Sequence, residues 1–356
     1  MKQRLLSLDI LRGITVAGMI LVNNAGGELS YDSLRHSAWN GLTPCDLVFP
    51  FFLFIMGIST YISLRKYEFR YSPAAAAKIV KRTLLILLIG WALTWFHHAC
   101  KGDFFPWDTL RLTGVLPRIA LCYGIVSLLA LSVPHRRLPL LVFLLLAGYT
   151  LLLLLGNGYV ADESNLLCRI DRALLGPSHL YHKSPIDPEG LAGTIASVAH
   201  TLIGFLCGAI ILRKQSIEQR LLRLFFVGFS LMAVGFLLTE WLPLNKRIWS
   251  PTYALVTCGL AAQLLAALAC LIDVEGRRSW CRGFEVFGVN PLFLYVLAEA
   301  VAVIVSVTGF KGMVYDALHA LLPNPYVASA AYSLLFVLVM GACGYPLYKK
   351  KIYIKL

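Results

Sequence analysis

The sequence predicts an all-α protein that crosses a membrane about ten times and forms one domain over residues 1–356. Its residues are 58% hydrophobic and only 14% charged, whereas about a quarter of the residues of a soluble domain are charged. The mean hydropathy is +0.72. Several charge-free stretches exceed the roughly 20 residues with which an α-helix crosses the hydrocarbon layer. These observations exclude a soluble globular fold.

Ten apolar runs have the length of membrane spans, and no internal repeat relates them. They cover residues 8–25, 46–64, 79–97, 112–133, 138–156, 190–212, 220–241, 251–272, 284–307 and 327–347. The first run is expected to be a retained span rather than a signal peptide, because Asp9 and Arg12 interrupt it and no cleavage site of small residues follows.

The distribution of charge predicts which side of the membrane each loop occupies. The net charge is +13, but the basic residues gather between apolar runs, so nucleic acid is not expected as a partner. Lys and Arg are concentrated in both termini and in the loops after even-numbered spans. The positive-inside rule therefore predicts that both termini are cytoplasmic.

The longest extracytoplasmic loop is predicted at residues 157–189, and it carries acidic residues, histidines and prolines. A loop of that length on one face is either a vestibule for a substrate or a solvated cap, and the sequence leaves both interpretations open. Asp187 and Glu189, at its end, are candidate substrate contacts.

No metal site or disulfide framework is expected. The nine cysteines include no Cys-x-x-Cys pair, and most lie inside apolar runs, where a thiol behaves as a small hydrophobe. His97 and His98 lie near Cys100, but adjacent residues do not share a helical face, and no carboxylate cluster has the spacing of metal ligands.

Four charged residues are expected at membrane depth, where an unpaired charge is costly. They are Asp9, Arg12, Arg118 and Glu299. Asp9 and Arg12 share one helical face, so they either form a structural ion pair or serve a ligand at the cytoplasmic mouth. Asn23 returns to nearly the same face as Arg12, roughly 16 Å further along the helix. One face of the predicted helix therefore carries Arg12 near its cytoplasmic end and Asn23 near its extracytoplasmic end.

Arg118 and Glu299 both follow helix-breaking prolines. Arg118 lies near the outer end of the fourth span, where it would hold an anion or pair with Asp103 or Asp108. Glu299 follows the break at residues 288–291 in the ninth span. Interrupted helices that line a cavity account for such residues better than helices that face lipid. Both are candidate substrate contacts.

His36 is expected close to the outer membrane face, in the segment after the first span. A histidine there is either a hydrogen-bonded structural residue or a catalytic base. The neighbours of His36 favour the catalytic base, because Asn23 offers an amide donor and Asp46 a carboxylate that could orient the imidazole. Such a trio suits acyl transfer. Trp39 and Asn40, which follow in the chain, are candidate substrate contacts.

Six stretches carry a resemblance to a known family. They are Ser7–Gly13, Val22–Asn23, His36–Thr43, Asp46–Pro50, Asp187–Ile195 and Leu244–Ser250. Together they resemble the heparan-α-glucosaminide N-acetyltransferase family of the transmembrane acyltransferase superfamily, and the resemblance covers nearly the whole chain. The chain departs from the animal enzyme by a longer glycine-rich segment between Asn23 and His36, and it is expected to lack that enzyme's luminal domain.

The resemblance implies an enzyme that takes acetyl from cytoplasmic acetyl-CoA and delivers it to the amine of a glucosamine-type amino sugar or glycan on the other side. His36 would correspond to the histidine implicated in acetyl transfer, and Asn23 to the family's functional asparagine. His36 would act as general base or as acyl carrier. The short chain is expected in a bacterial inner membrane, and a homodimer is expected by analogy.

The donor site is expected at the basic cytoplasmic face, because phosphates favour Arg and Lys. Arg12, with Asp9 beside it, is the first candidate for the CoA end, and Lys78 and Arg82 are further candidates. One alternative is a permease for an amino sugar or muropeptide fragment that keeps the fold without catalysis. A second is transfer of another acyl group to a polysaccharide hydroxyl.

Overall fold

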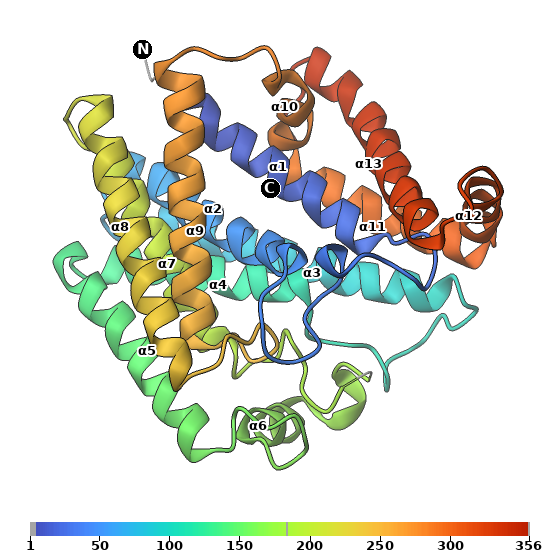
Figure 1. Cartoon of the computed structure of the whole chain (residues 1–356). Helices are drawn as coiled ribbons and strands as arrows, with labels where there is room; N and C mark the ends of the chain where they lie inside the picture. Colours follow the sequence, from blue (N-terminus) through green and yellow to red (C-terminus); the bar gives the residue numbers. More distant parts are fainter. Residues whose placement is uncertain (1–4, 183, 355–356) are drawn as a thin grey trace.

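A computed structural model describes residues 5–182 and 184–354, and all regular structure in this part of the chain is helical (Figure 1). The α-helices are α1 Leu6–Asn23, α2 Val48–Leu64, α3 Pro73–Ala99, α4 Val115–Ser132, α5 Leu138–Leu155, α6 Leu166–Leu175, α7 Thr194–Ile211, α8 Ile217–Leu237, α9 Pro251–Ala269, α10 Cys281–Val289, α11 Pro291–Val307, α12 Phe310–Leu321 and α13 Pro325–Lys349. Short 3-10 turns and one π-helical turn after α9 complete the secondary structure of these residues.

The predicted number of spans is confirmed. In the described residues, nine helical segments are long and apolar enough to cross a membrane, and the number is ten if α10 and α11 count as one broken span. These two helices meet at Asn290 with a bend of 84°, so the predicted ninth span is interrupted where its sequence places Asn-Pro. Helices α6 and α12 are additional to the predicted spans.

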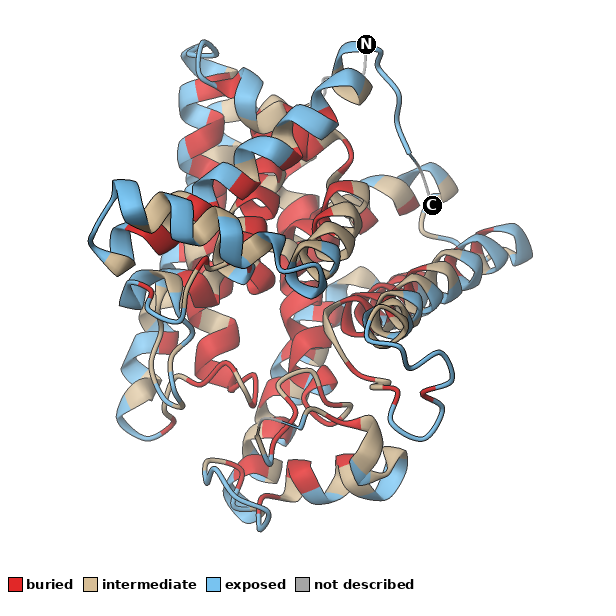
Figure 2. Cartoon of the chain, turned by 90° about the vertical axis from the view of Figure 1, so that its right-hand side faces the viewer, coloured by how far each residue is buried: buried red, intermediate tan, exposed pale blue. Residues whose placement is uncertain are grey.

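Burial is consistent with a bilayer around the molecule (Figure 2). Most residues of α7 are buried, whereas few residues of α3, α5 and α8 are buried. The exposed faces of the outer helices carry large apolar side chains, among them Leu88, Phe143 and Phe229. Water would not favour such faces, but lipid tails would.

Glycines bring the central helices into close contact. A Cβ atom on Gly57 of α2 would collide with the carbonyl oxygen of Thr201 in α7, and one on Gly204 of α7 would collide with that of Phe54. Small residues at helix crossings allow backbones in a membrane to approach one another. Gly13 of α1 meets α10 in the same way. The first two spans are thereby fixed against the rest of the bundle.

The start of α1 and the end of the described chain lie at one end of the bundle, here called the terminal face. The backbone amide of Leu6 donates to Asp273 after α9, over 3.2 Å. The tail at residues 351–354 is held by Asn290, whose Nδ2 donates to the carbonyl of Ile352 and whose Oδ1 accepts from the amide of Ile354. That this face is cytoplasmic stays a prediction.

The opposite end, here called the loop face, carries the connections that build the candidate site. Among them are residues 24–47, residues 157–182 and 184–193 with α6, and residues 241–250 (Figure 1). Loops distant in sequence meet there, and they form the candidate site.

Candidate active site

The His36 segment is shaped by the cap of the second span. Pro44–Leu47 form a 3-10 turn that leads directly into α2, and Thr43 and Asp46 form a capping box in front of it. Such a box satisfies amide groups that the first turn of a helix leaves without partners. The capping carboxylate is also the one that meets His36, so the start of α2 fixes the imidazole.

His36 and Asp46 are in direct contact. His36 Nδ1 lies 2.8 Å from Asp46 Oδ1. Asp46 Oδ2 accepts from the amides of Ser37 and Thr43, over 3.1 and 3.2 Å, and from Thr43 Oγ1 over 3.0 Å. The Asp46 side chain is fully buried, whereas 48% of the His36 side chain is exposed. The imidazole is thus held from the protein side and open on the other.

This contact determines which ring nitrogen is free to act as a base. Two acceptors repel one another at 2.8 Å, so we infer that His36 Nδ1 carries the ring proton and donates it to Asp46. The lone pair then lies on Nε2. A carboxylate that holds an imidazole in this tautomer is the arrangement that general base catalysis requires.

Lys246 is a member of the cluster that the sequence analysis missed. Its Nζ lies 2.9 Å from Nδ1 and 3.3 Å from Nε2 of His36, and 3.4 Å from Asp46 Oδ1. Only 11% of its side chain is exposed. It comes from the connection between α8 and α9, within the stretch Leu244–Ser250 that carries part of the family resemblance. That resemblance was the only available signal, because a lysine in a loop otherwise resembles any loop cation.

Buried hydrogen bonds join the Lys246 connection to the His36 segment. Asn245 is fully buried, and its Nδ2 donates to Asn40 Oδ1 over 3.1 Å. The amide of Gly41 donates to the carbonyl of Leu244 over 2.8 Å. Trp39 donates from Nε1 to the carbonyl of Tyr159, over 2.9 Å. The polar groups of Trp39 and Asn40, both predicted as substrate contacts, therefore hold loops together.

Cys45 and Tyr253 complete the surroundings of the cluster. Cys45 Sγ lies 3.0 Å from His36 Nδ1, but the residue is only 1% exposed. Tyr253, in α9, donates its hydroxyl to the carbonyl oxygen of Asp46 over 2.6 Å. Helix α9 therefore anchors the backbone that carries the carboxylate.

Asn23 lies in a second polar contact, apart from the one that joins His36 to Asp46. Its Nδ2 donates to Glu299 Oε1 over 3.2 Å, so the end of α1 meets the middle of α11. Of the three predicted catalytic residues, the structure joins His36 with Asp46 and joins Asn23 with Glu299.

The acidic residues at the end of the long loop form a buried ion cluster. Arg111 Nη2 donates to Asp187 Oδ1 over 2.6 Å and to Glu189 Oε2 over 2.8 Å. Asp187 also accepts from the hydroxyl of Thr113. Burial alone would raise the pKa of Asp187, but the Arg111 charge and these hydrogen bonds hold it below its usual range. Both predicted substrate contacts are therefore engaged with Arg111.

The predicted pairing of Arg118 with Asp103 or Asp108 is wrong. Arg118 is 1% exposed, and it donates to the backbone carbonyls of Pro188 and Gly190 over 2.9 and 2.6 Å. The carbonyls thus accept from both Nη atoms of the buried guanidinium, whereas its Nε has no hydrogen-bond partner among the described residues. Arg118 thus fixes the long loop on the bundle.

Asp171 is a further buried carboxylate in the described part of the predicted loop. It lies in α6, is 2% exposed and accepts from the amide of Ala192 over 3.1 Å. Burial raises its pKa to about 6, although the hydrogen bond from Ala192 opposes the shift. The loop is thus tied to α7 rather than extended into solvent.

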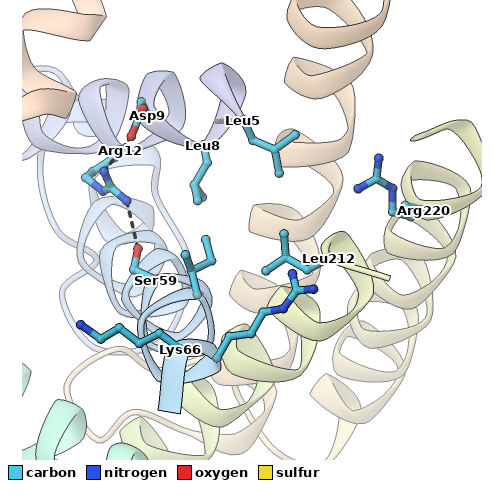
Figure 3. A pocket seen from close by; sticks show the side chains of 10 residues that line it. Leu5, Leu8, Asp9, Arg12, Ser59, Lys66, Leu212 and Arg220 are labelled. Atoms are coloured by element: carbon cyan, nitrogen blue, oxygen red, sulfur yellow. Dashed lines mark hydrogen bonds and ion pairs between the residues drawn. The ribbon is translucent and has the colours of Figure 1, made fainter. Parts of the chain in front are cut away.

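A cavity of about 800 Å³ opens at the terminal face (Figure 3). It is lined by Leu5, Leu8, Asp9, Arg12, Ser59, Ile62, Arg65, Lys66, Leu212 and Arg220. Arg12 donates to Asp9 Oδ1 and to Ser59 Oγ, each over 2.9 Å. Lys78 and Arg82 are not among the lining residues, and Arg82 instead lies over the ring of Tyr123.

No group of three or more His, Cys, Asp or Glu in residues 5–182 and 184–354 is arranged to hold a metal ion. His98, which the sequence analysis considered with His97 and Cys100, lies 3.1 Å from Asp103.

Comparison with known proteins places the chain in evolutionary context. The family model described as heparan-α-glucosaminide N-acetyltransferase, catalytic, matches residues 4–168. The chain is similar to the heparan-α-glucosaminide N-acetyltransferases. It is 30% identical to the human heparan-α-glucosaminide N-acetyltransferase over 417 aligned positions and 29% identical to the mouse protein over 416. The predicted family resemblance is confirmed.

Both alignments cover 99% of this chain, which spans about 60% of the length of these curated N-acetyltransferases. The region matched by the catalytic family model contains His36, Asp46 and Arg12, whereas Lys246 lies beyond it. Lys246 is covered by the pairwise alignments alone.

Proposed function

We propose that the chain is a membrane-bound acetyltransferase that moves acetyl from acetyl-CoA to the amine of a glucosamine-type amino sugar. The observation that carries the proposal is the half-exposed imidazole of His36, held at Nδ1 by the buried carboxylate of Asp46. The match of residues 4–168 to the catalytic family model supports it, and so do the names of the relatives.

In this proposal His36 Nε2 removes a proton from the acceptor amine while the amine nitrogen attacks the thioester carbon. Asp46 keeps the ring in the required tautomer and stabilises the imidazolium that forms. An acyl-histidine intermediate is the alternative use of the same nitrogen. Both routes need Nε2 accessible, and both depend on the contact between His36 and Asp46.

The donor is assigned to the cavity at the terminal face. The phosphate groups of CoA carry negative charge, and Arg12, Arg65, Lys66 and Arg220 give this cavity four cations. Lys78 and Arg82 are less suitable candidates, because neither lines the cavity. With both termini in the cytoplasm, as the positive-inside rule predicts, donor and acceptor would approach from opposite sides of a bacterial inner membrane.

Asn23 and Glu299 are assigned to the acceptor. The Asn23 amide, expected to be a donor beside His36, donates from Nδ2 to Glu299. The Glu299 carboxylate in α11 and the Asn23 amide oxygen at the end of α1 could accept hydrogen bonds from sugar hydroxyls. A homodimer, expected from the family, stays a prediction.

Purified protein in detergent tests this function when it is given radiolabelled acetyl-CoA and glucosamine. The proposal expects labelled N-acetylglucosamine to accumulate. Absence of transfer to several amino sugars would refute it. In that case counterflow of an amino sugar in proteoliposomes without CoA would identify a permease instead, and transfer of longer acyl groups to hydroxyls would identify a different acyltransferase.

A further inference from the structure

Lys246 is the least expected member of the site, because a buried ammonium is costly unless it is paired. It is 9% exposed as a residue. The charged partner is Asp46, whose Oδ1 lies 3.4 Å away, yet the shorter contacts of the ammonium are with the ring of His36. The Lys246 ammonium therefore contacts the imidazole of His36 as well as the carboxylate of Asp46.

Asp46 does not need Lys246 to satisfy its oxygens. It already accepts hydrogen bonds from two backbone amides and from the Thr43 hydroxyl, and His36 lies at its other oxygen. An ammonium group has three donors and no acceptor. Because Nδ1 carries the ring proton, its 2.9 Å contact with Lys246 Nζ is not a hydrogen bond, and Nε2, at 3.3 Å, is the ring nitrogen that can accept. Contacts with Asp46 and with His36 Nε2 use two of the three donors, so a third N–H remains for another partner.

The contact of Lys246 with the His36 ring determines which substrate atoms this third N–H can reach. Asp46 is fully buried, whereas 48% of the His36 side chain is exposed, so substrate can reach the site at the imidazole. Lys246 lies within 3.3 Å of Nε2, the atom that meets the acceptor amine in the proposed function. The thioester carbon attacked by that amine must come close to the same nitrogen. Its oxygen would then lie within reach of the flexible lysine side chain.

We propose that Lys246 is a catalytic residue whose ammonium donates a hydrogen bond to the thioester oxygen while that oxygen is negatively charged. This inference rests on the proposed acetyl transfer. The amine takes the place of Lys246 at Nε2, and the ammonium moves to the oxygen. Preorganised donors of this kind are worth roughly 10² to 10³-fold in turnover.

The step balances without any further reactant. The amine nitrogen bonds to the thioester carbon, its proton passes to His36 Nε2, and the carbonyl π pair moves onto oxygen, where Lys246 stabilises it. The pair then returns to re-form the carbonyl, the carbon–sulfur bond breaks, and the proton on His36 passes to the departing thiolate. The products are the N-acetylated amine and CoA with a free thiol.

A cycle of substrate and protein changes tests this role. Wild type and Lys246→Met are each given acetyl-CoA and its dithioester analogue, in which sulfur replaces the carbonyl oxygen and accepts hydrogen bonds poorly. Each rate is divided by that of the same reagent with glucosamine in buffer. Wild type should prefer the oxygen substrate by roughly 10² to 10³-fold. Lys246→Met should lose the preference for the oxygen substrate, and its kcat with acetyl-CoA should fall by a similar factor.

Matched variants separate this role from folding and from general charge. Lys101→Met removes an exposed cation from the loop after α3 and should leave kcat unchanged. Lys246→Arg keeps a charged donor and should retain more activity than Lys246→Met. If Lys246→Met does not fold, Lys246→Arg and Lys246→Gln carry the comparison. Acetyl-CoA affinity and the unfolding temperature report whether each variant is intact.

The outcomes distinguish the inference from the function on which it rests. If His36→Ala loses transfer while Lys246→Met keeps it within tenfold, or keeps the preference for oxygen, the role of Lys246 is refuted and the acetyltransferase stands. If wild type transfers no acetyl group, the proposed function fails and this inference fails with it.

Discussion

Lys246 Nζ lies 3.4 Å from Asp46 Oδ1. The connection between α8 and α9 therefore places a cation beside the 3-10 turn that precedes α2. The contact closes a cluster in which His36 has a carboxylate at one nitrogen and an ammonium at its edge. In the proposed mechanism the three residues have separate roles: Asp46 orients the imidazole, His36 transfers the proton and Lys246 stabilises the charge on oxygen.

Cys45 should be dispensable for acetyl transfer. Its sulfur lies 3.0 Å from His36 Nδ1, which superficially resembles a cysteine nucleophile with its base. The thiol is buried, however, and Nδ1 faces Asp46. Cys45→Ala should keep kcat within about tenfold, since it removes only a buried group that packs as a hydrophobe. A loss of more than about 10²-fold in a folded variant would make Cys45 the acyl carrier.

Asp46→Asn should damage both activity and stability. The ring would lose the charge that fixes its tautomer, so acetyl transfer should fall by about 10²-fold or more. Charged hydrogen bonds from Ser37 and Thr43 would also weaken, which should cost about 1–3 kcal/mol in free energy of unfolding. Initial rates and thermal unfolding in detergent measure the two effects.

Asp103→Asn is the matched control, because Asp103 also contacts a histidine but is exposed. Asp103→Asn should change neither the rate of acetyl transfer nor the free energy of unfolding. Equal effects of the two substitutions would contradict the special role of the buried carboxylate.

Arg12→Ala should weaken binding of CoA at least about tenfold, since hydrogen bonds to charged groups contribute about 1.5–3 kcal/mol. Isothermal titration measures the affinity. Because Asp9 would lose its partner in this variant, Lys66→Ala, at the exposed part of the same cavity, provides a second test. Lys78→Ala serves as the control outside the cavity lining. Unchanged affinity in both cavity variants would remove the cavity as the donor site.

Asp171 should make stability fall as pH rises. Its pKa is raised to about 6 in the fold, against about 3.9 in an unfolded chain. Between about pH 4 and 6 the Asp171 carboxyl is protonated in the native state but ionised in the unfolded chain. The stabilisation from this proton is therefore complete below about pH 4 and is lost as the pH rises through about 6. Asp171→Asn should abolish this loss, which amounts to at most about 3 kcal/mol.

Unfolding temperatures of wild type and Asp171→Asn from pH 4.5 to 7.5 test this prediction, and the advantage of the variant should grow with pH. Asp162→Asn, an exposed change in the same loop whose carboxyl pKa is lowered by hydrogen bonds with Ser164, should give no such growth. A pH-independent difference between wild type and Asp171→Asn would contradict the assignment.

Hydropathy predicted most of the fold because a span needs a long apolar run, which is a local property of sequence. Asn290 and Pro291 likewise marked the break between α10 and α11. Helices α6 and α12 were not predicted, because they are only 10 and 12 residues long. Neither forms an apolar run of membrane length.

The site was predictable only where its contacts are local. His36 and Asp46 are close in sequence, so their pairing could be anticipated. Lys246 is separated from His36 by 210 positions, and only the meeting of two loops brings it there. Arg118 was paired with the wrong partners because its true acceptors are backbone carbonyls, which leave no trace in residue identity.

The central claim is that His36 transfers a proton or an acyl group during N-acetylation. The most direct measurement compares wild type, His36→Ala and His98→Ala, another histidine beside a carboxylate, for transfer of radiolabelled acetyl from acetyl-CoA to glucosamine in detergent. We expect His36→Ala to lose about 10²-fold or more while acetyl-CoA binding and His98→Ala activity are preserved. Near-full transfer by a folded His36→Ala would contradict the proposed mechanism.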